Sequence, residues 1–258
     1  MEFRTESLRY HHACDRQPSA NGFCRHAHPQ YEILYFISGN ARCVIEHREY
    51  RLTKGDVVLI PPLYYHFISI DSPAPYERAV LNFSACDVSS QVLHAVFSEP
   101  RVINCTEDTH IDSLFSRMDM LLAAFDGEDA VRIANCLLTE LLYLLSKHNN
   151  THNRFTVYHN ETLRSALQYI EEHLAVIRTA DEIADALFIS RSQLYQCFKE
   201  AFGIPPMKYI LEKRLVLAQS RLQLGEKPTT VALACGFNEY SAFYRNYKKR
   251  FGHPPKSK

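Results

Sequence analysis

The chain has 258 residues, 46% hydrophobic and 22% charged, a composition typical of globular proteins that bury a core. It has no run of about 18 apolar residues, which argues against a membrane-spanning helix. Residues 1–17 are too polar and charged for a secretory signal, so we expect a cytoplasmic protein with no membrane partner. The eight cysteines are scattered without a Cys-x-x-Cys pair, which argues against a disulfide framework or a zinc finger.

The formal net charge is zero, but the charges are unevenly distributed. Residues 161–258 carry 15 Lys and Arg against 10 Asp and Glu, whereas residues 1–160 carry 14 against 19. A basic C-terminal part beside an acidic N-terminal part indicates that only the C-terminal part meets a polyanion such as nucleic acid.

Short aromatic and β-branched runs, separated by turn residues, occupy residues 22–84. The run YEILYFISGN ends at Gly39-Asn40, and a second turn is expected at Lys54-Gly55-Asp56. The apolar run VVLIPP ends at Pro61-Pro62. Strands at this spacing predict an antiparallel sandwich or barrel within residues 1–105.

After residue 104 the apolar residues recur every three or four positions, which is typical of helices. The segments DSLFSRMDMLLAAF and EDAVRIANCLLTELLYLLSKH, broken at Asp126-Gly127, predict a helical hairpin within residues 106–150. Its leucine-rich stripe is wider than one barrel needs as a cover. The stripe therefore needs an apolar partner surface. Packing onto the barrel or the linker is one alternative, and the one we expect is pairing with a second copy of the chain, which the family resemblance described below implies for such helices. Residues 151–160 are polar and aperiodic and form the predicted linker.

The segment FKEAFGIPP (198–206) returns as YKKRFGHPP (247–255) 49 residues later. Extended towards the N-terminus, each copy predicts a short helix, a tight turn and a second helix that ends at Gly203 or Gly252. Between the copies, residues 206–224 predict an amphipathic helix of about 28 Å. That length is close to one turn of DNA, roughly 34 Å, so the repeat indicates two DNA-reading helices on one spacer. A helical bundle without a DNA partner is the alternative.

Residues 161–258 resemble the DNA-binding region of the AraC/XylS family of bacterial transcription regulators, most clearly in ALACGFNEYSAFYRNYKKRFGHPP. The resemblance implies that both second helices enter successive major grooves of double-stranded DNA, and it allows RNA polymerase as a further partner. Pro205 and Pro254 depart from the Ser or Thr usual in the family. Arg245 is chemically the best base reader, because its guanidinium pairs bidentately with guanine. The implied DNA contacts are Ser190, Arg191, Ser192, Gln193, Tyr195, Gln196, Glu239, Tyr240, Ser241, Arg245, Asn246, Lys248 and Lys249.

The segment HAHPQYEILYFISG gives His26, His28 and Glu32 the same parity on a strand, so they would share one face, and YYH adds His66. Together with His66 they resemble the metal set of a cupin, a small jelly-roll barrel, and three imidazoles with a carboxylate suit a divalent transition metal. Leu63 and Ile70 depart from the cupin motif, so we expect an effector pocket without a cofactor. Its residues would be His26, His28, Glu32, Tyr35, Tyr64 and His66. The alternatives are a metal held by His26, His28, Glu32 and His66, and a purely structural role.

The sequence thus predicts an α+β chain in four parts. They are a cupin-like jelly roll (1–105), a dimerising hairpin (106–150), a linker (151–160) and an all-α domain of two helix-turn-helix motifs joined by a long helix (161–258). We expect a homodimeric DNA-binding transcription regulator, not an enzyme, that is controlled by a small-molecule effector. The rival hypothesis is a metal-dependent cupin enzyme fused to a DNA-binding module.

Overall fold

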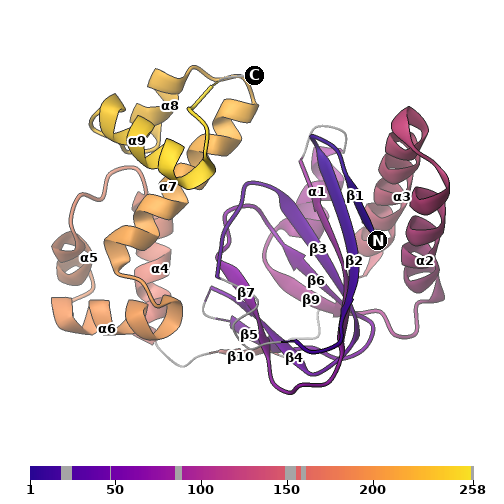
Figure 1. Ribbon diagram of the computed structural model, residues 1–258. Helices are drawn as coiled ribbons and strands as arrows, with labels where there is room; N and C mark the ends of the chain where they lie inside the picture. The colour runs from indigo at the N-terminus through magenta and orange to yellow at the C-terminus, as the bar shows by residue number, and fades with distance from the viewer. Residues whose placement is uncertain (19–24, 47, 85–88, 149–154, 158–160, 257–258) are drawn as a thin grey trace. The chain divides into compact units, whose positions relative to one another are not determined.

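The computed structural model describes residues 1–18, 25–46, 48–84, 89–148, 155–157 and 161–256 (Figure 1). The chain forms two units, one of Met1–His26 with Gln30–Thr156 and the other of Ala27–Pro29 with Val157–Lys258. The first combines antiparallel sheets with helices and the second is helical, as the predicted α+β class requires. In the described part of the chain, no helix is long and apolar enough to cross a membrane.

The strands of the first unit form a larger and a smaller sheet. The larger has the order β1-β2-β8-β3-β6-β9, and the smaller has the order β10-β5-β4-β7. The bounds are Glu2–Arg4 (β1), Leu8–Asp15 (β2), Tyr31–Ser38 (β3), Ala41–Ile45 (β4), Arg48–Arg51 (β5), Asp56–Ile60 (β6), His66–Ile70 (β7), Tyr76–Phe83 (β8), Arg101–Asn104 (β9) and Phe155–Val157 (β10).

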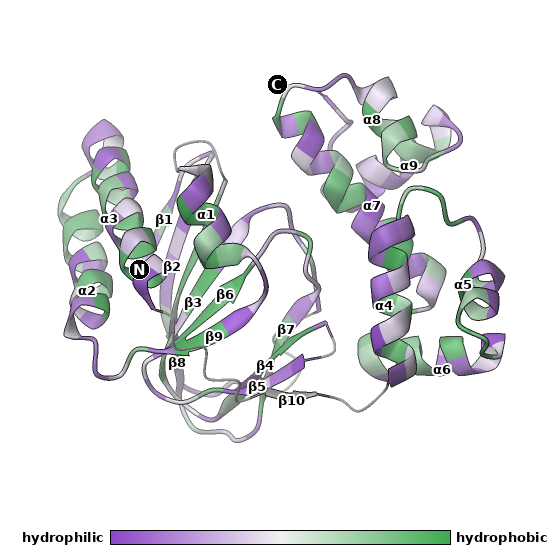
Figure 2. Cartoon of the chain, turned by 180° about the vertical axis from the view of Figure 1, so that it is seen from behind, coloured by the Kyte–Doolittle hydropathy of each residue, from purple (hydrophilic) through white to green (hydrophobic). Residues whose placement is uncertain are grey.

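Strand β3 lies inside the larger sheet and is buried on both faces, between β6 and β8. Leu34 and Phe36 point into a core that the two sheets share. Ile33 and Tyr35 point the other way, into a second core that the helices cover. Because side chains alternate along a strand, neighbouring positions of β3 serve two separate cores. In Figure 2 the strands β3 and β6 are coloured hydrophobic along most of their length.

Helices α1 (Ser90–Phe97), α2 (Thr109–Ala124) and α3 (Gly127–Lys147) cover the outer face of the larger sheet. The predicted hairpin is thus present as α2 and α3, and its leucine stripe is buried. Leu141, Leu142 and Leu145 are fully inaccessible to solvent, because they pack against α2 and the sheet of the same chain. The expectation that the leucine stripe exceeds what the barrel needs as a cover is therefore wrong. These leucines pack onto the barrel, which was the alternative.

The second unit contains the two predicted helix-turn-helix motifs. One consists of α5 and α6 and the other of α8 and α9, with α7 running between them (Figure 1). The bounds are Glu161–His173 (α4), Ala180–Ala186 (α5), Arg191–Phe202 (α6), Pro206–Gln223 (α7), Pro228–Ala234 (α8) and Tyr240–Phe251 (α9). The 18 residues of α7 span about 27 Å.

Local signals in the sequence explain where these helices begin and end. Gly203 and Gly252 cap α6 and α9 in the left-handed conformation, with φ of +70° and +78°. This conformation costs glycine little because it has no Cβ atom. Pro206 is the first residue of α7, where its missing N–H group costs nothing. The repeated Gly-x-Pro-Pro therefore ends the second helix of the motif in both copies, and in the first copy it also starts α7.

The two halves of the second unit meet around the loop that follows α4. Arg214 of α7 is buried and donates from Nε to the carbonyl of Leu174 (2.8 Å) and from a terminal nitrogen to that of Ile177 (2.5 Å). Arg178 donates to the carbonyl of Gly236, in the turn between α8 and α9 (2.8 Å). Two arginines thus tie the spacer and the second motif to one loop.

Some elements of the first unit lie outside the sequence prediction. Strands β1 and β2 precede the run of strands predicted at residues 22–84, and α1 and β9 follow that run, although all four lie within the predicted domain 1–105. Of the predicted linker 151–160, residues 151–154 and 158–160 lie outside the described residues, and Phe155–Val157 forms β10 at the edge of the smaller sheet. A three-residue edge strand needs no hydrophobic periodicity of its own, so the sequence gives little signal for it.

Candidate nucleic-acid interface and ligand site

Helix α6 has one buried face and one exposed polar face. Leu194 and Phe198, one turn apart, are fully buried. Arg191, Ser192 and Gln196 are exposed on the remaining surface, and Tyr195 is half-buried beside them. This is the division expected of a helix that packs on its own domain and presents polar groups to a partner.

Two of the residues predicted to contact DNA, Ser190 and Gln193, form hydrogen bonds with each other at the N-terminus of α6. The Ser190 hydroxyl accepts the backbone N–H of Gln193, and the Gln193 side chain accepts the N–H of Ser190 (2.9 Å). This reciprocal arrangement is a capping box, which fixes the start of the helix. Arg191 lies over the ring of Tyr195, 5.3 Å from its centroid. Ser192 and Gln196 are therefore the exposed positions that remain outside the cap.

Helix α9 repeats this plan with a more basic surface. Phe243 and Tyr247 are buried, whereas Tyr240, Ser241 and Arg245 are exposed. Glu239 is the N-cap residue but makes no side-chain capping bond. Asn246 is half-buried, and its amide donates to the carbonyl of Ala242 (2.9 Å).

The last turn of α9 carries Lys248, Lys249 and Arg250. Arg250 is paired with Glu212 of α7, with Nε 2.8 Å from the carboxylate. Lys248, Lys249 and Arg245 are exposed, and among the residues that the structure describes none forms an ion pair with them. Uncompensated cations beside a polar helix face suit contacts with phosphates and base edges.

The structure brings His26, Glu32 and His66 of the first unit together, whereas His28 belongs to the second unit. One ligand atom from each of the three lies within 4.8 Å of the others, with Glu32 and His66 buried and His26 exposed. His26 and His66 face each other through a pair of backbone hydrogen bonds, of 3.1 and 2.9 Å. Strand parity is not what groups them, because β3 begins only at Tyr31. A long-range bridge places His66 beside His26 instead.

Glu32 and His66 are held in fixed orientations. Asn82 of β8, directly opposite Glu32 in the sheet, donates its amide to Glu32 Oε2 (2.6 Å). His66 Nδ1 lies 2.9 Å from the carbonyl oxygen of Tyr64 and must donate to it, because a carbonyl only accepts. His66 Nε2 then faces Glu32 Oε2 at 3.6 Å. Burial opposes the charged form, but the Glu32 carboxylate outweighs burial and raises the pKa of His66.

Two further predicted pocket residues have different positions. Tyr35 lies on the face of β3 opposite to Glu32, where its hydroxyl donates to Asp112 of α2 (2.9 Å) and its ring stacks on Phe115. Burial, reinforced by the bond to Asp112, raises its pKa. Tyr64 packs against the core between the sheets. The structure thus places Tyr35 on the other face of β3 from Glu32, because the two residues are three positions apart and side chains alternate along a strand.

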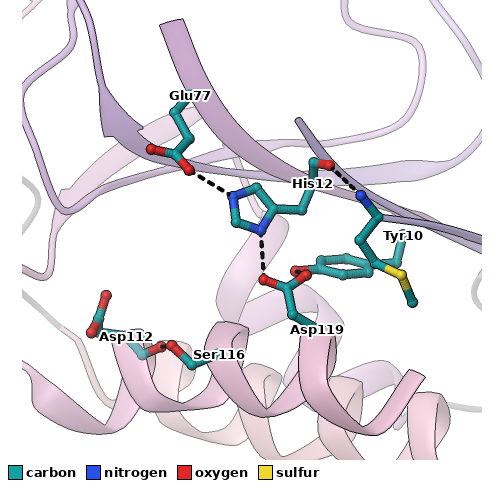
Figure 3. Close-up of polar contacts among 7 residues, drawn as sticks. Tyr10, His12, Glu77, Asp112, Ser116 and Asp119 are labelled. Carbon is teal, nitrogen blue, oxygen red and sulfur yellow. Dashed lines mark hydrogen bonds and ion pairs between the residues drawn. The ribbon is translucent and has the colours of Figure 1, made fainter. Parts of the chain in front are cut away.

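A polar cluster on helix α2 was not predicted from the sequence (Figure 3). The hydroxyl of Tyr10 donates to Asp119 Oδ1 (2.9 Å), and His12 lies between Asp119 (2.5 Å) and Glu77 (3.3 Å). Burial, followed by the bond to Asp119, raises the pKa of Tyr10. With Tyr35 and Asp112, these contacts fasten α2 to the larger sheet. Leu8, Tyr10 and His12 are alternate residues of β2 and so point to the same face, a pattern in the sequence that could have indicated a strand there.

An open polar hollow of about 1040 Å³ lies at the base of the hairpin. Asp108, which begins α2, pairs there with His148 at the end of α3, 2.8 Å apart. The hollow shares no residue with the histidine and glutamate cluster. The hollow and the cluster are therefore separate features.

Family models match most of the chain. Residues 8–146 match the model described as "AraC-like ligand binding domain". Residues 183–257 match the model described as "Helix-turn-helix domain". The first match contains the histidine and glutamate cluster, and the second contains both candidate reading helices.

Individual proteins are similar over different lengths. "HTH-type transcriptional activator RhaS" of Escherichia fergusonii is 24% identical over 91% of this chain and 86% of its own. "Msm operon regulatory protein" of Streptococcus mutans is 24% identical over 94% and 87%. "Probable transcriptional regulator LumQ" of Photobacterium leiognathi is 38% identical, but over 34% of this chain and only 36% of its own length. Among solved structures, apo ToxT from Vibrio cholerae superposes over 97% of this chain and 96% of its own, with a TM-score of 0.46 and 16% identity.

Proposed function

The chain belongs to the AraC family of transcription regulators, and we propose that α6 and α9 read two successive major grooves of its DNA target. The observation that carries this proposal is the pair of helices, each with an exposed polar face, at the two ends of α7. The spacer of about 27 Å is close to the roughly 34 Å between grooves on one face of DNA. The positive charge of residues 161–258 adds a sequence-independent attraction to phosphates.

Within this interface the predicted residues have different roles. Ser192 and Gln196 of α6, and Tyr240, Ser241 and Arg245 of α9, are exposed and would approach bases. Lys248 and Lys249 would contact phosphates. Ser190 and Gln193 would act indirectly: their capping box fixes the start of α6, and the N–H groups at that helix N-terminus would then be available to a DNA phosphate.

The test is DNA binding by the second unit alone. We expect residues 157–258 to select the operator of the full chain, because both motifs and their spacer lie inside this boundary. The affinity should fall steeply with salt as phosphate contacts release counterions. Electrophoretic mobility shifts at several salt concentrations would measure this, with residues 1–148 as the control that should not bind. A second unit that folds but binds every duplex equally would contradict the proposal.

We also propose that the histidine and glutamate cluster binds the effector that controls transcription. Its support is that buried polar groups converge inside the part of the chain that matches a ligand-binding domain. A regulator of DNA acts in the cytoplasm, and the names of the relatives favour a regulator over the rival cupin enzyme. Lack of turnover in the purified protein would be consistent with this preference, and catalysis at the cluster would contradict it.

Dimerisation through the hairpin remains a prediction. Because the leucine stripe is buried within the chain, we propose a different surface of the hairpin for it. Met120, Phe125 and Tyr143 are large apolar side chains that stay exposed on or beside α2 and α3. We expect residues 1–148 to form dimers at micromolar concentration, and Met120→Glu with Tyr143→Glu should return them to monomers. Sedimentation velocity measures both states. A wild-type fragment that stays monomeric at high micromolar concentration would exclude this surface.

A further inference from the structure

We propose that Phe188 contacts a thymine methyl group in the groove that α6 enters, an inference that rests on the proposed function. Phe188 lies in the turn between α5 and α6 (Figure 1). Its φ is +55°, and among the described residues of the second unit it is the one residue other than glycine with a left-handed backbone. Its side chain is 96% exposed. A bulky residue in this conformation is uncommon, and such outliers gather at functional sites.

The backbone of this turn requires the left-handed conformation. The N–H of Phe188 donates to the carbonyl of Asp185 (3.2 Å), and the N–H of Ile189 donates to that of Ala184 (3.0 Å). Many helices end with this pair of bonds, and the left-handed residue in it is usually glycine. A side chain at that position costs stability, because its Cβ atom crowds the following carbonyl oxygen.

The second motif has the same turn with glycine in it. The N–H groups of Gly236 and Phe237 donate to the carbonyls of Leu233 and Ala232, which repeats the pattern of the first turn. Gly236 lies against the backbone of Ala175, so a side chain is excluded there. The first motif has room for a side chain and carries a large apolar one that the fold does not bury. The phenyl group thus strains the fold without adding to its core, which indicates a role outside the chain.

The position of Phe188 beside α6 favours DNA as the partner. Ser190, two residues later, is the N-cap of α6, and two residues of chain span at most about 7 Å. Arg191 and Ser192, in the first turn of α6, are exposed. A helix that reads the major groove presents its N-terminal residues to base edges, so the turn before it lies at the same groove. The apolar group that a base pair presents there is the C5 methyl of thymine, and phenylalanine is one of the side chains that contact it.

The experiment compares the full chain with Phe188→Asn on the duplex that the full chain selects from a random pool, at one fixed salt concentration. Asn adopts the left-handed conformation more readily than Phe, so we expect the melting temperature of the second unit to rise by a few degrees. Operator binding should nevertheless weaken by about four-fold or more, as expected for loss of contact with one methyl group. A more stable protein that binds less tightly distinguishes a DNA contact from a structural role.

A modified duplex identifies the group that Phe188 contacts. Thymines in the half-site that α6 binds are replaced one at a time by deoxyuridine, which removes only the C5 methyl. One replacement should weaken wild-type binding about four-fold and leave the binding of Phe188→Asn unchanged, because the two partners of the contact are coupled. Leu224→Asn, which changes another exposed apolar residue at the C-terminal end of α7, is the control and should respond to deoxyuridine as the wild type does.

Unchanged affinity of Phe188→Asn for the selected duplex would overturn the inference. The absence of any deoxyuridine effect, or an effect of equal size in both proteins, would also overturn it. If Phe188→Asn bound DNA as the wild type does but failed to regulate transcription by purified RNA polymerase, the phenyl group would contact a protein instead. A full chain that selects no duplex would contradict the proposed function itself, so the two failures are distinguishable.

Discussion

Replacing Arg245 by Ala is expected to weaken binding to the operator about five- to 150-fold, or about 1–3 kcal/mol, and to relax the base preference at one position. Arg245 is exposed on α9, and no described residue pairs with its guanidinium. Its planar fork is therefore available to bind a guanine edge through two hydrogen bonds. The measurement is the ratio of specific to nonspecific affinity at one fixed salt concentration.

Two further substitutions separate base reading from charge. Arg245→Lys keeps the positive charge but loses the fork, so it should lose selectivity and retain nonspecific affinity. Lys249→Ala removes a charge from the last turn of α9, so it should weaken binding to all sequences and lower the salt slope by about one. If Arg245→Ala and Lys249→Ala behaved alike, Arg245 would be a phosphate contact and α9 would be oriented differently in the groove.

The second unit could be predicted in detail because its signals are local. Ser190, Gly203 and Gly252 act within one helical turn of themselves, so their caps follow from neighbouring residues alone. The repeat then fixed the order of the motifs, and α7 ends one residue from its predicted end. Ser190 and Gln193 fit the Ser-x-x-Gln pattern of a capping box, so their mutual hydrogen bonds are also a local feature, and these bonds change the role of both residues at the interface.

The first unit depended on long-range contacts that a sequence does not display. The leucines of α3 predicted an exposed stripe, but the outer face of the larger sheet needed a cover, and α2 and α3 supply it. Strand β2 was missed because His11, His12 and Arg9 interrupt its apolar residues, although Leu8 and Tyr10 are buried. The amount of hydrophobic surface to be covered is a property of the assembled sheet and not of any one segment.

The histidine and glutamate cluster combines residue types that the sequence displays with a spatial arrangement that it does not display. The sequence grouped the four residues by strand parity, whereas in the structure a backbone bridge is what brings His66 beside His26. Parity, applied strictly, would have excluded Tyr35, which is three positions from Glu32 and so faces the helices. Composition indicated the chemistry, and tertiary pairing decided which side chains meet.

Gly236→Ala is expected to destabilise the second unit by about 2–5 kcal/mol, combining overpacking with left-handed strain. Gly236 has φ +85°, and a Cβ atom there would lie 2.4 Å from the carbonyl oxygen of Ala175 and 2.9 Å from its carbon atoms. Backbone atoms cannot rotate away as a side chain can, so the turn between α8 and α9 must shift. That shift would also strain the bond from Arg178 to the Gly236 carbonyl, which ties the second motif to the loop after α4.

Gly203→Ala is the matched control, because Gly203 also has a positive φ, +70°, but a Cβ atom there would meet nothing within 4 Å. It should cost only the left-handed strain, about 1–2 kcal/mol. A unit of this size loses roughly 4–8 °C in melting temperature per kcal/mol, so the two variants should be resolved by circular dichroism at the helical transition. Operator binding near the melting temperature of the variant should fail first for Gly236→Ala. If both variants lowered the melting temperature equally, close approach to Ala175 would not be the reason that position 236 is glycine, and backbone conformation alone would explain it.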